Sequence, residues 1–202
     1  MKKSILILAT FLTIALASCE KTAVVVEPLA AKTAKNIAAS PNVSLTGQPI
    51  APTGKFTLFS FANGEVSNAD SASTKWDIGF RGTTIMLNGG TSGPGQAGVI
   101  IKDGLFDDFK EITETTFLQD AKPAFAITAS SGKGWYNYNA TTNIISPIPG
   151  KVFLVKTADG KFAKFEVVSY YKDAPAVIEQ TTPARYYTIR YIYQPDGSKK
   201  LI

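Results

Sequence analysis

Short runs of apolar residues, separated by turn residues, fill the chain from residue 55 onward. Residues 55–62 are rich in Phe and Leu and lead directly into Asn63-Gly64. Residues 151–157 and 161–171 flank the sequence Ala158-Asp159-Gly160. Asn-Gly and Asp-Gly between β-type runs indicate tight hairpin turns. The pattern therefore predicts antiparallel strands on both sides of each turn.

One short stretch alternates apolar and polar residues strictly. Successive side chains of a strand point to opposite faces, so Trp76, Ile78 and Phe80 are expected to face a core. Asp77 and Arg81 are then expected on the other side, where they can form an ion pair along the strand.

Helical patterns are weak throughout the chain. The best helical segment, residues 107–119, is rich in Ile and Thr, which are poor helix formers. Residues 185–194 are dense in aromatic and β-branched residues, as is typical of strands. The sequence therefore predicts an all-β fold, a sandwich or barrel-like body of two antiparallel sheets.

The N-terminal segment has the features of an export signal. Lys2 and Lys3 precede an apolar run that is too short to span a bilayer, and the run ends in Leu16-Ala17-Ser18-Cys19. This ending resembles a bacterial lipobox, in which the signal is cleaved before the cysteine and the thiol carries a lipid. The alternative is an ordinary signal peptide followed by a free thiol, which is a liability in an exported protein.

Three parts of the chain follow from these patterns. We expect a lipoprotein signal peptide at 1–18, a lipidated flexible tether at 19–54 and one β domain at 55–202. The tether is rich in Ala, Lys, Thr, Val and Pro and would hold the domain away from its lipid. Residues 24–26 and 37–39 could instead dock as an edge strand or a short helix.

The composition excludes several kinds of chemistry. The chain has no histidine, one cysteine and two methionines. A His general base, a Ser-His-Asp triad and a Cys/His zinc site are therefore absent, and we expect no enzyme. The net charge is +5, and removal of Lys2 and Lys3 leaves 5 − 2 = +3. No basic run is longer than Lys199-Lys200, so nucleic-acid binding is not expected.

Five sequence blocks follow one another along the chain: FSFANGEV (59–66), KWDIGFR (75–81), LNGGTSGPGQAG (87–98), GKGW (132–135) and VFLVKTADGKFAKFEVVSYY (152–171). In this order they resemble the HmuY family of exported haem-binding lipoproteins of Bacteroidetes. The resemblance runs from about Phe56 to Tyr193. It implies an all-β body of two antiparallel sheets, with haem held between finger loops.

The resemblance also implies where haem ligands belong. The family holds the iron with two histidines or methionines. One lies between the glycine-rich loop and the GKGW-like block, here within about 105–128, and the other a few residues after the tryptophan, here at Ala140. Neither position of this chain offers His or Met. Both ligands of the family are therefore missing.

Other residues near the second ligand position could take part in binding. Tyr136 and Tyr138 alternate after Trp135 and share a face, and a phenol oxygen can ligate ferric haem or a phenol ring can stack on it. With Asn139 these residues form the predicted ligand-binding set. Met86 is the remaining candidate iron ligand. Each of these side chains could equally serve only to pack a β core.

Two further motifs lack the context that their chemistry requires. Asp107 and Asp108 are adjacent, so on a strand they would point to opposite faces rather than act as an acid/base pair. The glycine-rich stretch 89–95 is followed by no Lys-Ser/Thr pair, so it lacks the phosphate-binding signature.

Together these features predict a lipid-anchored protein on the outer membrane, facing the cell surface. It would capture haem or another porphyrin for iron acquisition by burying it in an apolar cleft, and a TonB-dependent receptor is a possible partner. The alternative is a HmuY-like protein that has lost haem ligation and binds another apolar or glycan ligand or a partner protein.

Overall fold

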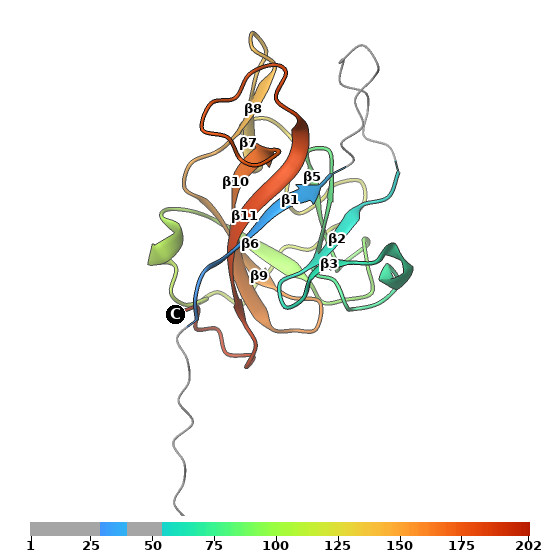
Figure 1. The fold of residues 1–202 in the computed structure, drawn as a ribbon. Helices are drawn as coiled ribbons and strands as arrows, with labels where there is room; N and C mark the ends of the chain where they lie inside the picture. The colour runs from blue at the N-terminus through green and yellow to red at the C-terminus, as the bar shows by residue number, and fades with distance from the viewer. Residues whose placement is uncertain (1–28, 40–53) are drawn as a thin grey trace, which may run out of the picture.

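The described part of the chain, residues 29–39 and 54–202 of a computed structural model, consists of strands, loops and two short 3-10 helices (Figure 1). The predicted all-β fold is confirmed, and no helix among these residues is long and apolar enough to cross a membrane. The strands are β1 (Lys32–Ala38), β2 (Thr57–Ser60), β3 (Gly64–Val66), β4 (Ile78–Arg81), β5 (Thr84–Leu87), β6 (Gly98–Asp103), β7 (Tyr136–Asn139), β8 (Ile144–Pro147), β9 (Lys151–Lys156), β10 (Phe162–Tyr171) and β11 (Ala184–Gln194). The 3-10 helices are η1 (Asn68–Asp70) and η2 (Phe106–Asp108).

The strands form two antiparallel sheets and a separate hairpin. The larger sheet has the order β1-β11-β10-β9-β6, and the smaller has the order β3-β2-β4-β5. The hairpins predicted at Asn63-Gly64 and at Ala158-Asp159-Gly160 are both present, as β2–β3 and β9–β10. The third sheet contains only β7 and β8.

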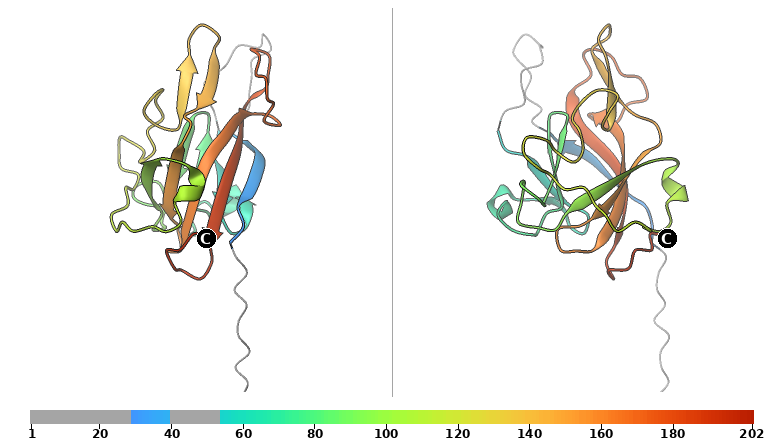
Figure 2. Two further views of the ribbon diagram at one scale, coloured as in Figure 1. Left: turned by 90° about the vertical axis from the view of Figure 1, so that its left-hand side faces the viewer. Right: turned by 180° about the vertical axis from the view of Figure 1, so that it is seen from behind.

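The main core lies between the two sheets, which face one another in Figure 2. Aromatic rings from opposite sheets meet there. The ring centroids of Phe80 and Tyr187 are 4.6 Å apart, and those of Phe59 and Tyr191 are 5.7 Å apart. Such tilted and edge-on aromatic contacts stabilise a core beyond the burial of apolar area alone.

Asp77 corrects one sequence-based expectation. Its carboxylate is buried and accepts hydrogen bonds from the backbone N–H groups of Phe61 and Ala158, each at 2.9 Å, so it connects the two sheets. Arg81 lies instead over the ring of Phe56, 4.2 Å from its centroid. The predicted ion pair was wrong because the side of the strand that carries Asp77 is covered, and its carboxylate is buried against backbone N–H groups instead of facing Arg81. Burial raises the pKa of Asp77 to about 6.

A second apolar cluster covers the outer face of the larger sheet. It joins Phe106 and Ile112, from the segment after β6, to sheet residues such as Leu154. Residues 107–119, the best helical segment of the sequence, form no α-helix, because their backbone pairs with distant parts of the chain. Leu118 forms a bridge to Val99, and Ile112 N–H donates to the carbonyl of Lys199 at 3.0 Å.

A buried lysine anchors this covering segment. The ammonium of Lys164, on β10, donates to the carbonyl oxygens of Phe106 and Phe109 at 2.8 and 2.7 Å. Burial lowers the pKa of Lys164. Beside it, Arg190 forms ion pairs with Asp107 and Glu166. These contacts fix η2 against the sheet.

Strand β1 lies inside the range 19–54 that was predicted to be a tether. It pairs with β11 at the edge of the larger sheet, and Ile37 is 1% exposed. The edge-strand alternative for residues 37–39 is therefore the one that the structure contains. Residues 1–28 and 40–53 lie outside the described part of the chain. They include the predicted signal peptide 1–18, Cys19, residues 24–26 and the rest of the predicted tether.

Candidate functional site

The β7–β8 hairpin holds most of the predicted ligand-binding residues. It projects beyond the end of the larger sheet where β10 ends (Figure 1). Tyr138 pairs with Ile145 across the hairpin, and Ile145 N–H donates to the hydroxyl of Tyr171 at 2.9 Å. Contact with β10 thus supports one side of the hairpin.

Trp135 packs at the base of the hairpin and is 1% exposed. Its indole N–H donates to the carbonyl of Thr83 at 2.8 Å, and its ring lies 5.4 Å from that of Tyr170 and 5.0 Å from that of Tyr187. Burial raises the pKa of both Tyr170 and Tyr187 further above the ordinary value of 10. Trp135 therefore belongs to the core and presents no surface to a ligand.

The structure explains why the GKGW block has a glycine at position 134. A Cβ at this position would lie 1.8 Å from the carbonyl oxygen of Thr128. The segment before β7 can approach the backbone at 128 only because residue 134 has no side chain. This close approach brings the chain into β7 with Trp135 turned into the core.

Tyr136 and Tyr138 share a face, as predicted, yet their surroundings differ. Tyr136 is 8% exposed, and its hydroxyl donates to the carbonyl of Ala129 at 3.3 Å. Tyr138 is 46% exposed, and its hydroxyl donates to Oδ1 of Asn143 at 2.6 Å. This face of β7 is buried at Tyr136, at the base of the hairpin, and is exposed to solvent at Tyr138, two residues later. Of the two phenols, only that of Tyr138 is accessible to a ligand.

Asn139 and Ala140 lie where the hairpin turns. The side-chain oxygen of Asn139 accepts from the N–H groups of Thr141 and Thr142 at 2.9 and 3.2 Å, so it stabilises the turn. Ala140, at the position of the family's second ligand, offers only a methyl group. The turn therefore supplies no imidazole or thioether to an iron.

The segment 105–128, where the family's first ligand is expected, supplies no such donor either. Its buried carboxylate, Asp120, accepts from the backbone N–H groups of Leu87 and Ala126, each at 2.9 Å. Both oxygens thus already hold the chain together. The residues present do not fit coordination of haem by two axial ligands of the family type.

Met86 lies on β5, on the face opposite to the buried Ile85 and Leu87. Its methyl group is 3.1 Å from the point that a Cβ on Gly79 would occupy, and Leu58 lies beside it. The side chain is half-buried and fills the space above a glycine of the neighbouring strand. This environment is typical of a packing methionine.

The glycine-rich loop 89–95 is folded around a buried asparagine. Asn88 Nδ2 donates to the carbonyl oxygens of Ser73 and Trp76, and its Oδ1 accepts from the N–H of Gly95. The N–H of Thr91 donates to the carbonyl of Asp120. These backbone groups are already paired, so the loop is a structural element, as the missing phosphate signature indicated.

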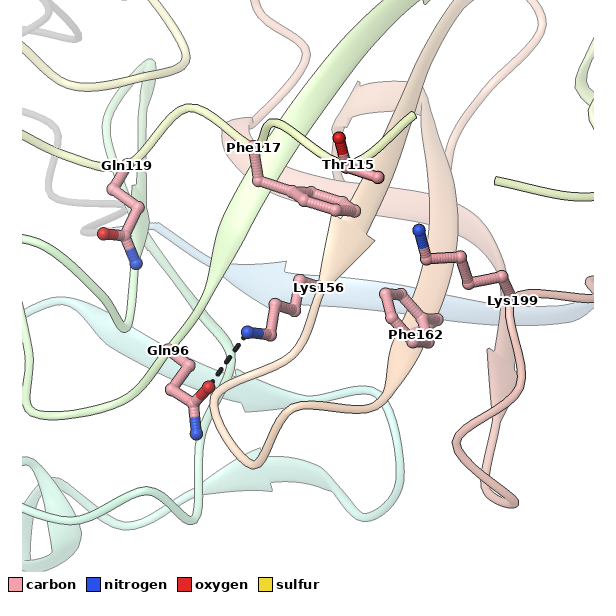
Figure 3. Close-up of a pocket in the computed structure, with 7 residues that line it drawn as sticks. All are labelled: Gln96, Thr115, Phe117, Gln119, Lys156, Phe162 and Lys199. Atoms are coloured by element: carbon pink, nitrogen blue, oxygen red, sulfur yellow. Dashed lines mark hydrogen bonds between the residues drawn. The ribbon is translucent and has the colours of Figure 1, made fainter. Parts of the chain in front are cut away.

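A hollow with a volume of about 370 Å³ lies on the outer side of the larger sheet (Figure 3). None of its lining residues belongs to the predicted site. It combines two phenylalanine rings with two lysines and three neutral polar side chains. The lining residues are Gln96, Thr115, Phe117, Gln119, Lys156, Phe162 and Lys199.

A smaller hollow of about 130 Å³ lies beside the buried carboxylate of Asp77 and is also lined by Asp159, Lys75 and Tyr193. Within the described residues, no group of three or more Asp, Glu, Cys or His side chains is arranged to hold a metal ion. Neither hollow is lined by residues of the β7–β8 hairpin.

Sequence patterns did not indicate the lysines that matter to the structure. Lys164 alternates with apolar residues in FAKFEVV, but alternation alone does not show that the segment 105–118 covers that face. Lys156 and Lys199 are far apart in sequence and line the same hollow only because of the fold. The sequence pointed to one of these lysines only through the basic pair Lys199-Lys200, and that pair did not show what either side chain contacts.

Known proteins resemble this chain to different degrees. A search of curated proteins finds no match. Among solved structures, a candidate HmuY-like haem-binding protein of Bacteroides vulgatus ATCC 8482 is similar, with 18% identity, a TM-score of 0.49, and coverage of 81% of this chain and 91% of the other. A candidate lipoprotein of Bacteroides fragilis NCTC 9343 has 17% identity, a TM-score of 0.47, and coverage of 82% and 92%.

The apo form of the HmuY analogue of Tannerella forsythia is also similar, with 16% identity, a TM-score of 0.47, and coverage of 83% and 96%. All three TM-scores lie below 0.5. The HmuY protein family model, in contrast, matches residues 53–191, which is more than half of the chain. The chain therefore belongs to the HmuY family.

Proposed function

We propose that this protein is an exported, lipid-anchored binding protein that captures haem at the β7–β8 hairpin, with Tyr138 as its single protein ligand to the iron. Membership of the HmuY family supports haem as the cargo. The absence of histidine from the sequence means that any ligation must use another atom. A phenol oxygen is an established type of axial ligand for ferric haem.

The exposure of Tyr138 is the observation that carries this proposal. It is 46% exposed on the hairpin whose turn contains the family's second ligand position, while Tyr136 is buried against Ala129. Its hydroxyl donates a hydrogen bond to Oδ1 of Asn143, five residues away. This hydrogen bond can orient the ring. Among the described residues, this hydroxyl forms no hydrogen bond with a backbone group of the core.

Most of the binding free energy would come from burial of the porphyrin. Removal of apolar area from water contributes about 25 cal/mol per Å². Tyr138 and Ile145 pair across the hairpin and present apolar surface of this kind. The phenol oxygen would add selectivity for the iron-containing form of the ring.

A hemin titration followed by the Soret band tests the proposal. We expect a saturable shift with the wild-type protein and at least about tenfold weaker binding by Tyr138→Phe, which corresponds to ~1.4 kcal/mol. Tyr193→Phe is the matched control, because Tyr193 lines the hollow beside Asp77 and lies outside the hairpin. Equal hemin binding by wild type and Tyr138→Phe, or no spectral change at all, would reject Tyr138 as the ligand.

The lipid anchor is a separate part of the proposal. Cys19 ends a lipobox-like sequence, and the tether that follows would present the domain at the outer membrane, facing the cell surface. Cells expressing the full chain should incorporate labelled palmitate into the wild-type protein and none into Cys19→Ala. A TonB-dependent receptor is the kind of partner that would take haem from such a protein for iron acquisition.

A further inference from the structure

The hollow on the outer side of the larger sheet has the composition of a binding site. It is formed where the end of β9, the start of β10, the loop before β6 and two covering segments meet, and Figure 3 shows their side chains around one space. Its volume, about 370 Å³, falls within the range of about 300–1,000 Å³ that is usual for small-molecule pockets.

Two aromatic rings form its apolar wall. The ring centroids of Phe117 and Phe162 are 6.2 Å apart, with an interplanar angle of 38°. Both side chains are half-buried and pack against the apolar cluster that contains Leu154 and Ile112. A flat apolar ligand in this hollow would therefore contact aromatic surface that is supported from below.

Two lysines give the hollow a positive charge. Lys156 Nζ donates to Oε1 of Gln96 at 2.9 Å, and Lys199 Nζ donates to the backbone carbonyl of Glu114 at 2.9 Å. Both partners are neutral. Lys199 also lies 5.8 Å from the centroid of the Phe162 ring, so charge and aromatic surface are adjacent.

The nearby carboxylates are already occupied. The carboxylate of Glu114 pairs with Lys102, and that of Asp159 pairs with Lys161. Within the described residues, no carboxylate forms an ion pair with Lys156 or Lys199, and none lines the hollow. A concave surface with uncompensated charge of one sign attracts ligands of the opposite sign.

We propose that this hollow binds a small planar aromatic anion, with its ring against Phe117 and Phe162 and its carboxylate between Lys156 and Lys199. The exposed side chains of Gln96, Gln119 and Thr115 lie at the rim and can donate or accept further hydrogen bonds. Charge-assisted hydrogen bonds from ammonium groups are stronger than neutral ones and would fix the orientation of the carboxylate. This site is independent of the proposed haem site on the β7–β8 hairpin.

Titration with 2-naphthoate, followed by NMR of the amide groups, tests the proposal. We expect saturable shifts at the backbone of Phe117, Phe162 and Lys156. The neutral analogue 2-naphthamide and the ringless anion acetate should each bind at least about tenfold more weakly, because each lacks one of the two features recognised. Equal binding of naphthoate and naphthamide, or the absence of saturable shifts, would overturn the proposal.

Variants of the two lysines provide a second arm. Lys156→Met and Lys199→Met keep the apolar stem of the side chain and should each weaken naphthoate binding by about tenfold. Lys200→Met removes the same charge from the neighbouring residue, which does not line the hollow, and should leave binding unchanged. If all three variants bind alike, the two lysines do not recognise the carboxylate. Hemin binding should not change in any of them, which separates this test from that of Tyr138.

Discussion

The interface between the two sheets and the turn of the β7–β8 hairpin use the same types of polar side chain in different ways. In the interface, the hydroxyl of Tyr187 reaches the carbonyl of Gly82, 105 residues away, and Asp77 reaches Ala158, 81 residues away. In the hairpin, the hydroxyl of Tyr138 reaches Asn143, only five residues away. The interface thus connects distant segments, while the hairpin end is stabilised locally.

We therefore expect the interface to determine the stability of the fold and the exposed end of the hairpin to determine binding. Substitutions in the interface should lower the free energy of unfolding, because they leave buried groups unpaired or open cavities. Substitutions at the exposed end of the hairpin should leave the fold intact and change only binding. The following predictions test this division, from the largest expected effect to the smallest.

The largest effect is expected at Gly134. In Gly134→Ala the new methyl group would meet the carbonyl oxygen of Thr128 at 1.8 Å, and because that oxygen is backbone the chain itself must move. We expect a loss of at least about 3 kcal/mol in the free energy of unfolding, measured with urea. Gly132→Ala is the matched control. A Cβ there would meet only Oδ1 of Asn137, at an ordinary contact distance of 3.8 Å, so the cost of about 1 kcal/mol comes from the φ of 77°. Equal losses at the two positions would contradict the packing described for Gly134.

Trp135→Phe should have the next largest effect. The smaller ring leaves a cavity among Tyr136, Tyr170 and Tyr187 and leaves the carbonyl of Thr83 without its donor. We expect a loss of about 2–3 kcal/mol, measured by urea denaturation. A variant as stable as the wild type would show that Trp135 is not part of the core, and would reopen the possibility that it contacts ligand.

The contribution of Asp77 should depend on pH. Its pKa in the fold is about 6, above the ordinary value of 3.8, so the folded state binds the proton more tightly than the unfolded chain. The resulting stabilisation is fully present below pH 3.8 and is lost as the pH rises through about 6. The wild type should therefore gain stability relative to Asp77→Asn between pH 7 and pH 4. The opposite trend would show that the two backbone N–H donors outweigh desolvation.

Tyr138→Phe should have the smallest effect on stability, within about 0.5 kcal/mol of the wild type, because the lost hydrogen bond is exposed. Tyr187→Phe removes the corresponding hydroxyl from the core and leaves the carbonyl of Gly82 unpaired, so it should cost about 1–2 kcal/mol. Thermal and urea unfolding of both variants would measure this. Equal effects would remove the distinction between the two regions.

Local sequence patterns predicted much of the fold. Asn63-Gly64 and Ala158-Asp159-Gly160 identified two hairpins because their turns require particular backbone angles. Alternation placed Ile78 and Phe80 in the core. The same rule could not show that Asp77 is buried, because the N–H groups of Phe61 and Ala158 that its carboxylate accepts from belong to other segments. Nor could it show that the segment after β6 covers the larger sheet.

The candidate site was less accessible to sequence reasoning. The sequence placed Tyr136 and Tyr138 on one face correctly, but only the structure shows that the face passes from the core to the surface between them. The hollow between Lys156 and Lys199 brings together five separate segments of the chain. Such a site depends on tertiary packing, so local sequence patterns do not predict it.

A comparison of hemin with iron-free protoporphyrin IX tests the central claim most directly. Both rings bury the same apolar area, so a difference in affinity reports the bond to iron. We predict that the wild type binds hemin at least about tenfold more tightly than the iron-free ring, and that Tyr138→Phe binds the two rings equally. Equal binding of the two rings by the wild type, or a preference for hemin that persists in Tyr138→Phe, would contradict ligation by Tyr138.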